Sequence, residues 1–378
     1  MQPTAKANPR SHHHLIAPDL LRGAAIVMVL FFHVFGPMCG HWLDLKHDPL
    51  AQYTFFPISF FWTGVALFFV LSGFCIHFSF LKSVELTWSK FFWLRIWRLY
   101  PAYIIALVFF TVFTKINLRT FGGIALFGSH ALFLHNISGR FFGGINPAFW
   151  SLAVEVQLYL LFPLVILARK RWGIEGSLVV TGTVALLARG LVCVLWGLPD
   201  RLGEPAFSSP FTSWFDWTLG AFVAERFTQN RRGFKQHSLW LLILFPLFFI
   251  STISTVPASL FSFSLAAVIS AVILDLLVAT NLPKSRFLSV ATFIGTISYS
   301  VYLWHQPLLH PLSDHLQFLP IILRWIVVLA LIFGISTFSW FFIERTGIKL
   351  GHLIWKSWQE RSVSKIGQAH LANQVSEA

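Results

Sequence analysis

The chain has 378 residues, of which 56% are hydrophobic, 17% are aromatic and only 11% are charged. A soluble domain carries about 25% charged residues, so this composition excludes an ordinary soluble protein and indicates a membrane protein with many spans. The formal net charge of +13 does not indicate nucleic-acid binding, because the basic residues cluster in short segments between apolar runs. The three cysteines, Cys39, Cys75 and Cys193, fit neither a disulfide framework nor a metal-binding spacing.

The N-terminal segment 1–18 is polar and contains three consecutive histidines, His12, His13 and His14. This triplet favours a solvated tail over a metal site. The apolar run that follows contains Arg22 and lacks a small-residue cleavage site. We therefore interpret it as a retained first helix and not as a signal peptide.

Apolar stretches of about 17 to 25 residues are long enough to cross a bilayer as helices. The sequence predicts an all-α polytopic membrane protein with about ten such helices, at 19–38, 57–80, 100–115, 148–168, 176–197, 211–227, 238–254, 258–280, 293–311 and 320–343. We expect one membrane domain over 1–356 and a polar cytoplasmic tail over 357–378.

The distribution of basic residues predicts the orientation. With the N-terminus inside, 20 basic residues fall in inner segments and 6 in outer ones, and this bias places both termini in the cytoplasm. The apolar segment 122–137 is not counted as a span, because counting it would move Arg169, Lys170 and Arg171 to the outside. The region 120–146 is therefore predicted to be an interfacial or re-entrant outer element between the third and fourth helices.

Ionisable residues inside apolar helices are costly, so each is a candidate functional residue. The sequence places ten of them there: Asp19, Arg22, His33, His77, Glu155, Arg189, Asp216, Glu225, Asp275 and His305. We interpret Asp216 and Asp275 as structural partners of Arg189.

Three of the candidates, His33, Glu155 and His305, lie roughly 7 to 10 Å below the outer ends of their helices, at about 1.5 Å per residue. Three groups at one depth are able to line one pocket, and an imidazole beside a carboxylate is the minimum for general base catalysis. The competing interpretation is that each histidine is a hydrogen-bonded packing residue.

Arg22 and His33 are eleven residues apart, which is about three helical turns. Their side chains therefore share one helix face, roughly 16 Å apart along the axis.

Two further arginines, Arg95 and Arg98, share a helix face within the aromatic segment 91–101, and Pro101 is expected to begin the third helix. The simpler interpretation, which we favour from the residues alone, is that these arginines meet lipid phosphates. The other is that they bind the phosphates of a ligand, for which a guanidinium group is well suited.

Taken together, these motifs resemble the acyltransferase 3 family of integral-membrane acyltransferases. The resemblance covers nearly the whole chain and is carried by segments 20–23 with His33, 64–74, 95–103, 149–159, 297–307 and 343–345. Ala66 and Val156 depart from the family pattern, in which many members have an acidic residue at the first position and a second glutamate at the other. Neither departure changes His33 or Glu155, but both are expected to alter the pocket and therefore the choice of acceptor.

The resemblance implies transfer of an acyl group, with acetyl expected, from cytoplasmic acyl-CoA to a hydroxyl of a cell-surface saccharide or lipid-linked glycan. It implies acetyl-CoA as co-substrate, no permanently bound cofactor, and a place in the bacterial inner membrane among lipids. His33 matches the essential histidine, as general base or acyl carrier, and Glu155 matches the family's glutamate. Donor binding is assigned to Arg22, Arg95 and Arg98, and the possible pocket residues are Ser72, Trp150, Ser151, Tyr159, Tyr299 and His305.

Family members often append an extracytoplasmic hydrolase-like domain, which we do not expect here because about 35 residues follow the last predicted helix. The main alternative function is a transporter or flippase of an acylated or lipid-linked glycan, since intramembrane His and Glu also suit proton coupling. The sequence lacks the paired Gly/Pro-broken helices that usually accompany a transporter site. A third possibility is a structural subunit with lipid-facing arginines.

Overall fold

The structure is a computed structural model that describes residues 15–35, 53, 56–83, 87–196, 205–283 and 285–376. All regular secondary structure in these residues is helical, and seven of the helices are long and apolar enough to cross a membrane. The predicted class, an all-α multi-pass membrane protein, is confirmed. The N-terminal histidines and most of the first outer loop lie outside the described residues.

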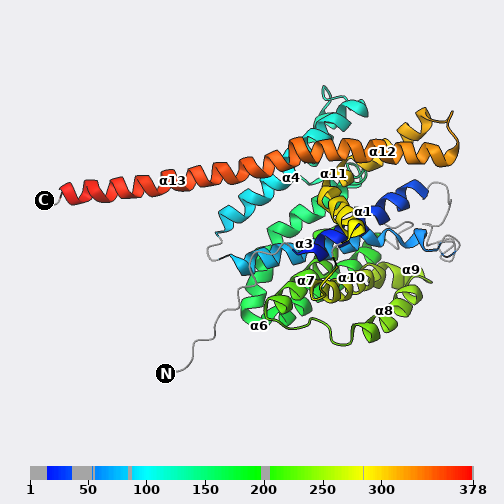
Figure 1. Cartoon of the computed structure of the whole chain (residues 1–378), viewed down its shortest axis with the longest axis horizontal. Helices are drawn as coiled ribbons and strands as arrows, with labels where there is room; N and C mark the ends of the chain where they lie inside the picture. The colour runs from blue at the N-terminus through cyan, green and yellow to red at the C-terminus, as the bar shows by residue number, and fades with distance from the viewer. Residues whose placement is uncertain are drawn as a thin grey trace.

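The long helices form one bundle, from which the last helix projects (Figure 1). Every predicted apolar segment overlaps a helix of this bundle: α1 (Ile16–Phe35), α3 (Thr63–Lys82), α4 (Trp88–Phe113), α6 (Phe149–Trp196), α7 (Pro210–Thr228), α8 (His237–Ser251), α10 (Phe263–Val278), α11 (Arg286–His315) and α12 (Ile321–Ser339). Shorter helical elements are η3 (Ile58–Phe60), α5 (Phe121–Ala131), η4 (His135–Ile137), η5 (Pro205–Phe207), α9 (Thr255–Pro257) and the π-helical turns η6 (Ala258–Ser262) and η7 (Trp340–Glu344). The chain ends in α13 (Arg345–Ser376), so the described part of the predicted polar tail is helical.

The helix α6 contains a sharp reversal at Gly173, whose backbone has φ 76° and ψ 177°. The Ser177 hydroxyl donates to the Val165 carbonyl at 3.3 Å, although residues 12 apart in a straight helix are roughly 18 Å apart. The predicted segments 148–168 and 176–197 are therefore the two arms of a hairpin, and glycine adopts the positive φ at the turn without strain.

The helix α4 begins at Trp88, thirteen residues before Pro101, so the prediction that Pro101 begins the third helix is wrong. Within a helix a proline leaves the carbonyl four residues earlier without its usual donor, here that of Trp97. A Cβ at Gly347 of α13 would lie 3.1 Å from this carbonyl oxygen. The Trp93 indole also donates to the Gly351 carbonyl at 2.9 Å, so α13 supports α4 where proline interrupts its hydrogen bonding.

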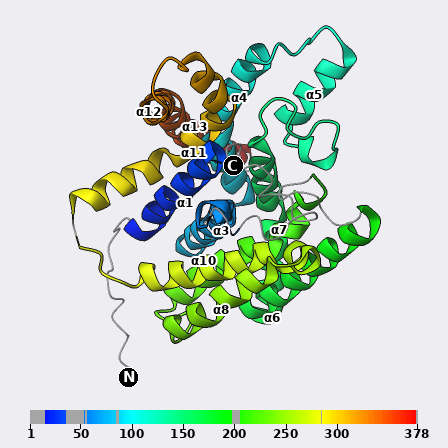
Figure 2. The ribbon, with the colours of Figure 1, turned by 90° about the vertical axis from the view of Figure 1, so that its right-hand side faces the viewer.

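Close helix crossings determine which side chains meet inside the bundle, where α3 lies near the middle (Figure 2). A Cβ at Gly220 of α7 would lie 1.8 Å from the Val70 carbonyl oxygen of α3, and a Cβ at Gly295 of α11 would lie 1.8 Å from the Asp19 carbonyl oxygen of α1. Only glycine permits such approach of two backbones. The second crossing packs α11 along α1.

Arg189 and Asp216 form a buried ion pair at 2.9 Å, which confirms one predicted partnership. The other is wrong: Asp275 accepts hydrogen bonds from the backbone N–H groups of Gly233 and Phe234 at 3.0 and 3.1 Å, and its carboxylate lies 2.8 Å from His237 Nε2. Asp275 therefore holds the loop between α7 and α8.

A second buried cluster joins three helices. Arg169 of α6 donates two hydrogen bonds to the Glu225 carboxylate of α7, at 2.6 and 2.7 Å, and His77 Nε2 of α3 lies 2.7 Å from the same carboxylate. Two of the candidate functional residues, His77 and Glu225, are thus part of a structural ion cluster.

The region 120–146 forms the short helix α5 and the turn η4, and the 11 residues of α5 are too few to cross a bilayer. Asn136 and Gln157 exchange side-chain amide hydrogen bonds at 3.0 and 2.8 Å, which attaches this outer element to α6. The buried rings of His130 and His135 stack with centroids 4.0 Å apart and planes 4° from parallel.

Candidate active site

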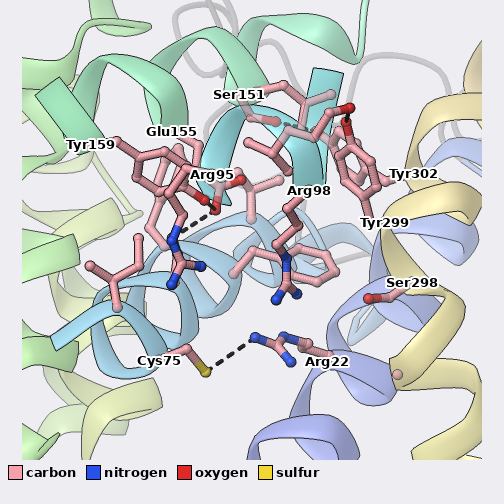
Figure 3. Close-up of a pocket in the computed structure, with 18 of the residues that line it drawn as sticks. Arg22, Cys75, Arg95, Arg98, Ser151, Glu155, Tyr159, Ser298, Tyr299 and Tyr302 are labelled. Carbon is pink, nitrogen blue, oxygen red and sulfur yellow. Dashed lines mark hydrogen bonds between the residues drawn. The ribbon is translucent and has the colours of Figure 1, made fainter. Parts of the chain in front are cut away.

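A polar pocket lies between α1, α3, α4, α6, α11 and η7 (Figure 3). It contains about 850 Å³ of space between atoms, part of it open to solvent. Its polar lining consists of Arg22, Ser72, Cys75, Arg95, Arg98, Ser151, Glu155, Tyr159, Thr296, Ser298, Tyr299, Tyr302 and Glu344.

The three arginines predicted to bind a donor all line this pocket, and their guanidinium groups point toward one shared space (Figure 3). Arg22 donates to the Asp19 carboxylate at 2.8 Å and to the Cys75 sulfur at 3.1 Å. Within the described part of the chain, Arg98 has no hydrogen-bond or ion-pair partner. The interpretation that Arg95 and Arg98 face lipid is therefore wrong, because their side of α4 is turned toward the pocket.

Glu155 enters the pocket from α6, where one of its oxygens, Oε1, accepts hydrogen bonds from the Ser72 hydroxyl at 2.7 Å and the Tyr159 hydroxyl at 2.6 Å. No contact joins Glu155 to His33 among the described residues. The structure thus brings Glu155 together with the arginines and not with the imidazole that it was expected to orient.

His33 lies in the last turn of α1, and its Nδ1 is 2.8 Å from the Val29 carbonyl oxygen. A carbonyl oxygen only accepts, so we assign the ring proton to Nδ1, which leaves the lone pair of the neutral ring on Nε2. The ring of His305 lies 5.0 Å from that of His33, centroid to centroid, and its Nδ1 is likewise 2.8 Å from a carbonyl, that of Tyr302. Two of the three groups expected at one depth, His33 and His305, thus lie side by side, although neither of them lines the pocket.

The order of residues along α11 relates the pocket to these histidines. Gly295, Ser298, Tyr299 and Tyr302 line the pocket, whereas His305, one turn further on, does not. Seven residues span roughly 10 Å of helix, so the pocket reaches from the level of Gly295 to that of Tyr302. His33 and His305 lie just beyond the end of the pocket that Tyr302 lines.

The predicted common depth holds for the two histidines but not for Glu155. Ser151 of α6 is level with Tyr302, because their hydroxyl oxygens are 2.7 Å apart. Glu155 follows Ser151 by four residues, roughly 6 Å further inward.

Of the predicted pocket residues, Ser72, Ser151, Tyr159 and Tyr299 line the pocket. His305 and Trp150 are not among the lining residues; the Trp150 ring instead packs against Phe69, with centroids 6.5 Å apart.

Two lining residues, Glu344 and Tyr302, lie in the motif segments 343–345 and 297–307 but were not predicted to belong to the site. Glu344 is buried in the π-helical turn η7, where its carboxylate accepts a hydrogen bond from the Ser300 hydroxyl at 2.9 Å. A π-turn shifts the helical register by about one residue, which no hydrophobic pattern reveals. Tyr302 could have been found, because it precedes His305 by three residues and so shares its helix face.

Fold and pocket together define a multi-pass membrane protein with an internal polar binding site. The chain belongs to the acyltransferase 3 family, whose acyltransferase-domain model matches residues 15–344. The protein is therefore an acyltransferase, and the resemblance seen in the sequence motifs is confirmed.

Two relatives illustrate the range of the family. Nodulation protein 10 of Rhizobium leguminosarum bv. viciae is 25% identical, over 91% of this chain and 96% of its own length. Peptidoglycan O-acetyltransferase OatA of Listeria monocytogenes is 30% identical over 74% of this chain but only 50% of its own length, so this chain corresponds to about half of that relative. No solved structure matches the chain.

Proposed function

We propose that this acyltransferase moves an acyl group, with acetyl expected, from cytoplasmic acyl-CoA to a hydroxyl of a saccharide or lipid-linked glycan at the outer face. The observation that carries the proposal is the placement of two kinds of side chain. The three arginines converge at one end of the pocket, and His33 lies just beyond the other end. The name of the relative OatA, a peptidoglycan O-acetyltransferase, supports a saccharide acceptor.

The pocket suits a coenzyme A thioester because such a donor carries phosphates at one end and the reactive carbonyl at the other. Guanidinium groups bind phosphates through paired, charge-assisted hydrogen bonds. Arg98 has free donors for this purpose within the described structure, and Arg22 and Arg95 lie beside it (Figure 3). The thioester end then extends along α11 toward Tyr302 and His33.

His33 supplies the base. Its Nε2 takes the proton from the acceptor hydroxyl, the hydroxyl oxygen attacks the thioester carbonyl, and the carbon–sulfur bond breaks. The proton then passes from His33 to the departing thiolate, so free CoA leaves as a thiol. A two-step route uses the same lone pair, with an acyl-His33 intermediate that the acceptor hydroxyl attacks next.

Glu155 remains part of the proposed catalytic machinery, with a different task from the one first expected. Its carboxylate holds the Ser72 and Tyr159 hydroxyls and places a negative charge beside the arginines. In this role it keeps the donor-binding groups in position and partly balances their mutual repulsion.

The orientation in the bacterial inner membrane is also part of the proposal. The 20-to-6 division of basic residues supports about ten spans with both termini in the cytoplasm. This places the arginine end of the pocket on the side of the acyl-CoA supply. The proposed location of the C-terminus is tested by fusing green fluorescent protein to it, because this protein fluoresces only in the cytoplasm. We expect the fusion to be fluorescent.

The function is tested with purified protein, labelled acetyl-CoA and a glycan acceptor. We expect release of free CoA and labelling of the acceptor by the wild type, and loss of both in His33→Ala. His315→Ala is the matched control, because this exposed histidine also lies near the outer end of a helix and its Nδ1 is 2.7 Å from the carbonyl four residues earlier. Wild-type transfer by a normally accumulating His33→Ala protein would refute the mechanism, and a transporter would leave the labelled acetyl-CoA intact.

A further inference from the structure

Two hydroxyl groups from two helices meet at the end of the pocket that lies nearest to His33 and His305. The Tyr302 hydroxyl of α11 lies 2.7 Å from the Ser151 hydroxyl of α6, and both residues line the pocket. Both are buried, with 6% of each residue exposed. The Tyr302 ring is also 5.3 Å from that of His305, which packs against His33. Tyr302 is thus the lining residue that connects the pocket to the histidine pair.

Attack of a hydroxyl on a thioester moves negative charge onto the carbonyl oxygen. A fixed hydrogen-bond donor at that oxygen, inside a site that excludes water, stabilises the transition state strongly, and removing one such donor typically lowers kcat about 100- to 1,000-fold. The proposed reaction therefore requires a donor close to His33, and the mechanism so far does not provide one.

The other pocket tyrosines are already committed as donors. Tyr159 donates to the Glu155 carboxylate at 2.6 Å, and Tyr299 donates to the Leu99 carbonyl at 2.8 Å. A carboxylate and a carbonyl only accept, so these protons are not available to a substrate. Tyr302 differs because its partner is a hydroxyl, which can donate as well as accept. The Ser151 hydroxyl also lies 3.4 Å from the Ala148 carbonyl oxygen, but its contact with the Tyr302 hydroxyl is much shorter, at 2.7 Å. When Ser151 donates to the phenol oxygen, the Tyr302 proton is free to point into the pocket.

We propose that Tyr302 is a catalytic residue that donates a hydrogen bond to the thioester carbonyl oxygen, and that Ser151 holds it in position. The inference rests on the proposed acyl transfer. During attack the electron pair of the carbonyl double bond moves onto oxygen, where the Tyr302 O–H stabilises it. The pair returns when the carbon–sulfur bond breaks, and Tyr302 keeps its proton throughout.

The test is the steady-state kinetics of Tyr302→Phe, which removes the hydroxyl and retains the ring. We expect kcat to fall about 100- to 1,000-fold, while the KM for acetyl-CoA and the calorimetric affinity for CoA stay within a few-fold of wild type. Tyr103→Phe is the matched control, because this buried tyrosine does not line the pocket and its hydroxyl donates to a backbone carbonyl, that of His130, at 2.8 Å. Its kcat should stay near wild type. Ser151→Ala should lower kcat less than Tyr302→Phe.

Two results would overturn the assignment: an unchanged kcat in Tyr302→Phe, or a loss of CoA affinity that accounts for the whole decrease. In either case an inactive His33→Ala protein would leave the proposed function intact, so the two failures are distinguishable. Should Tyr302→Phe fail to accumulate, 3-fluorotyrosine at position 302 replaces it as the variant. Its more acidic hydroxyl should change kcat without changing KM, and an unchanged kcat would again refute the role.

Discussion

At the scale of single residues, the family resemblance implied most of the groups that meet in the pocket, and helical periodicity indicated which of them share a helix face. Arg22 and His33 lie on one continuous helix, so their common face follows from 3.6 residues per turn. The contact of Glu155 with Tyr159, four residues away on α6, follows from the same periodicity. The pairing of Glu155 with Ser72 of α3, and not with His33 of α1, was not predictable, because it depends on the relative heights of separate helices. Spacing within one helix can be read from sequence, whereas the relative heights of two helices cannot.

Arg98 provides a test of the donor site. Arg98→Ala should raise the KM for acetyl-CoA about 10- to 100-fold, because a charge-assisted hydrogen bond contributes about 1.5 to 3 kcal/mol and each 1.4 kcal/mol corresponds to tenfold. Arg98→Lys should recover part of this loss, since it keeps the charge but not the paired donors. The exposed Arg171, at the turn of α6, supplies the control substitution Arg171→Ala. Equal KM values for the two alanine variants would exclude Arg98 from donor binding.

At the scale of elements, hydropathy located the apolar segments but not their full lengths or bends. It missed the first three turns of α4, which are aromatic and basic, and the register shift of η7 that places Glu344 in the pocket. It separated the two arms of α6 correctly, because the basic residues before Gly173 interrupt the apolar run. A helix was therefore predictable where its residues are apolar, and its ends and bends were not predictable where polar residues or a change of helix type determine them.

The crossing of α1 and α11 gives the element-scale prediction. Gly295→Ala places a methyl group where the Asp19 carbonyl oxygen would be only 1.8 Å away, so the helices must separate. We expect a melting temperature in detergent lowered by several degrees, since overpacking costs about 1 to 3 kcal/mol, together with loss of transfer because His33 shifts relative to the pocket.

Gly334→Ala on α12 is the control for this prediction, since no atom lies within 4 Å of a Cβ there. It should match the wild type in melting temperature and in transfer. Equal melting temperatures for Gly295→Ala and Gly334→Ala would contradict the importance of the crossing.

At the scale of the whole molecule, acid should weaken the packing of the outer element on the bundle. Outside the membrane-spanning segments, burial lowers the pKa of His130 from 6.5 to about 4, and burial together with the neighbouring His130 lowers that of His135 to about 3. The unfolded chain therefore binds more protons than the folded one between those values, so the stabilisation is complete above pH 6.5 and is lost as the pH falls toward 4 and then 3.

The measurement is the melting temperature of purified protein at pH 7.5 and pH 5. The wild type should lose more stability on acidification than a His130→Phe/His135→Phe variant, which keeps the stacked rings without titrating. The same decrease in both proteins would show that other groups dominate the acid response.

The contact between α4 and α13 determines how far the chain can be shortened from its C-terminus. The segment of α4 that carries Arg95 and Arg98 packs against α13, with the Trp93 indole bonded to the Gly351 carbonyl and the Trp97 side chain against Gly351. The arginine end of the pocket is thus braced by α13, whose residues are not among those that line the pocket. A chain that is cut before residue 351, with or without a purification tag at the cut, would lack this brace. We expect such an enzyme to bind the proposed donor poorly, although every residue that lines the pocket would still be present.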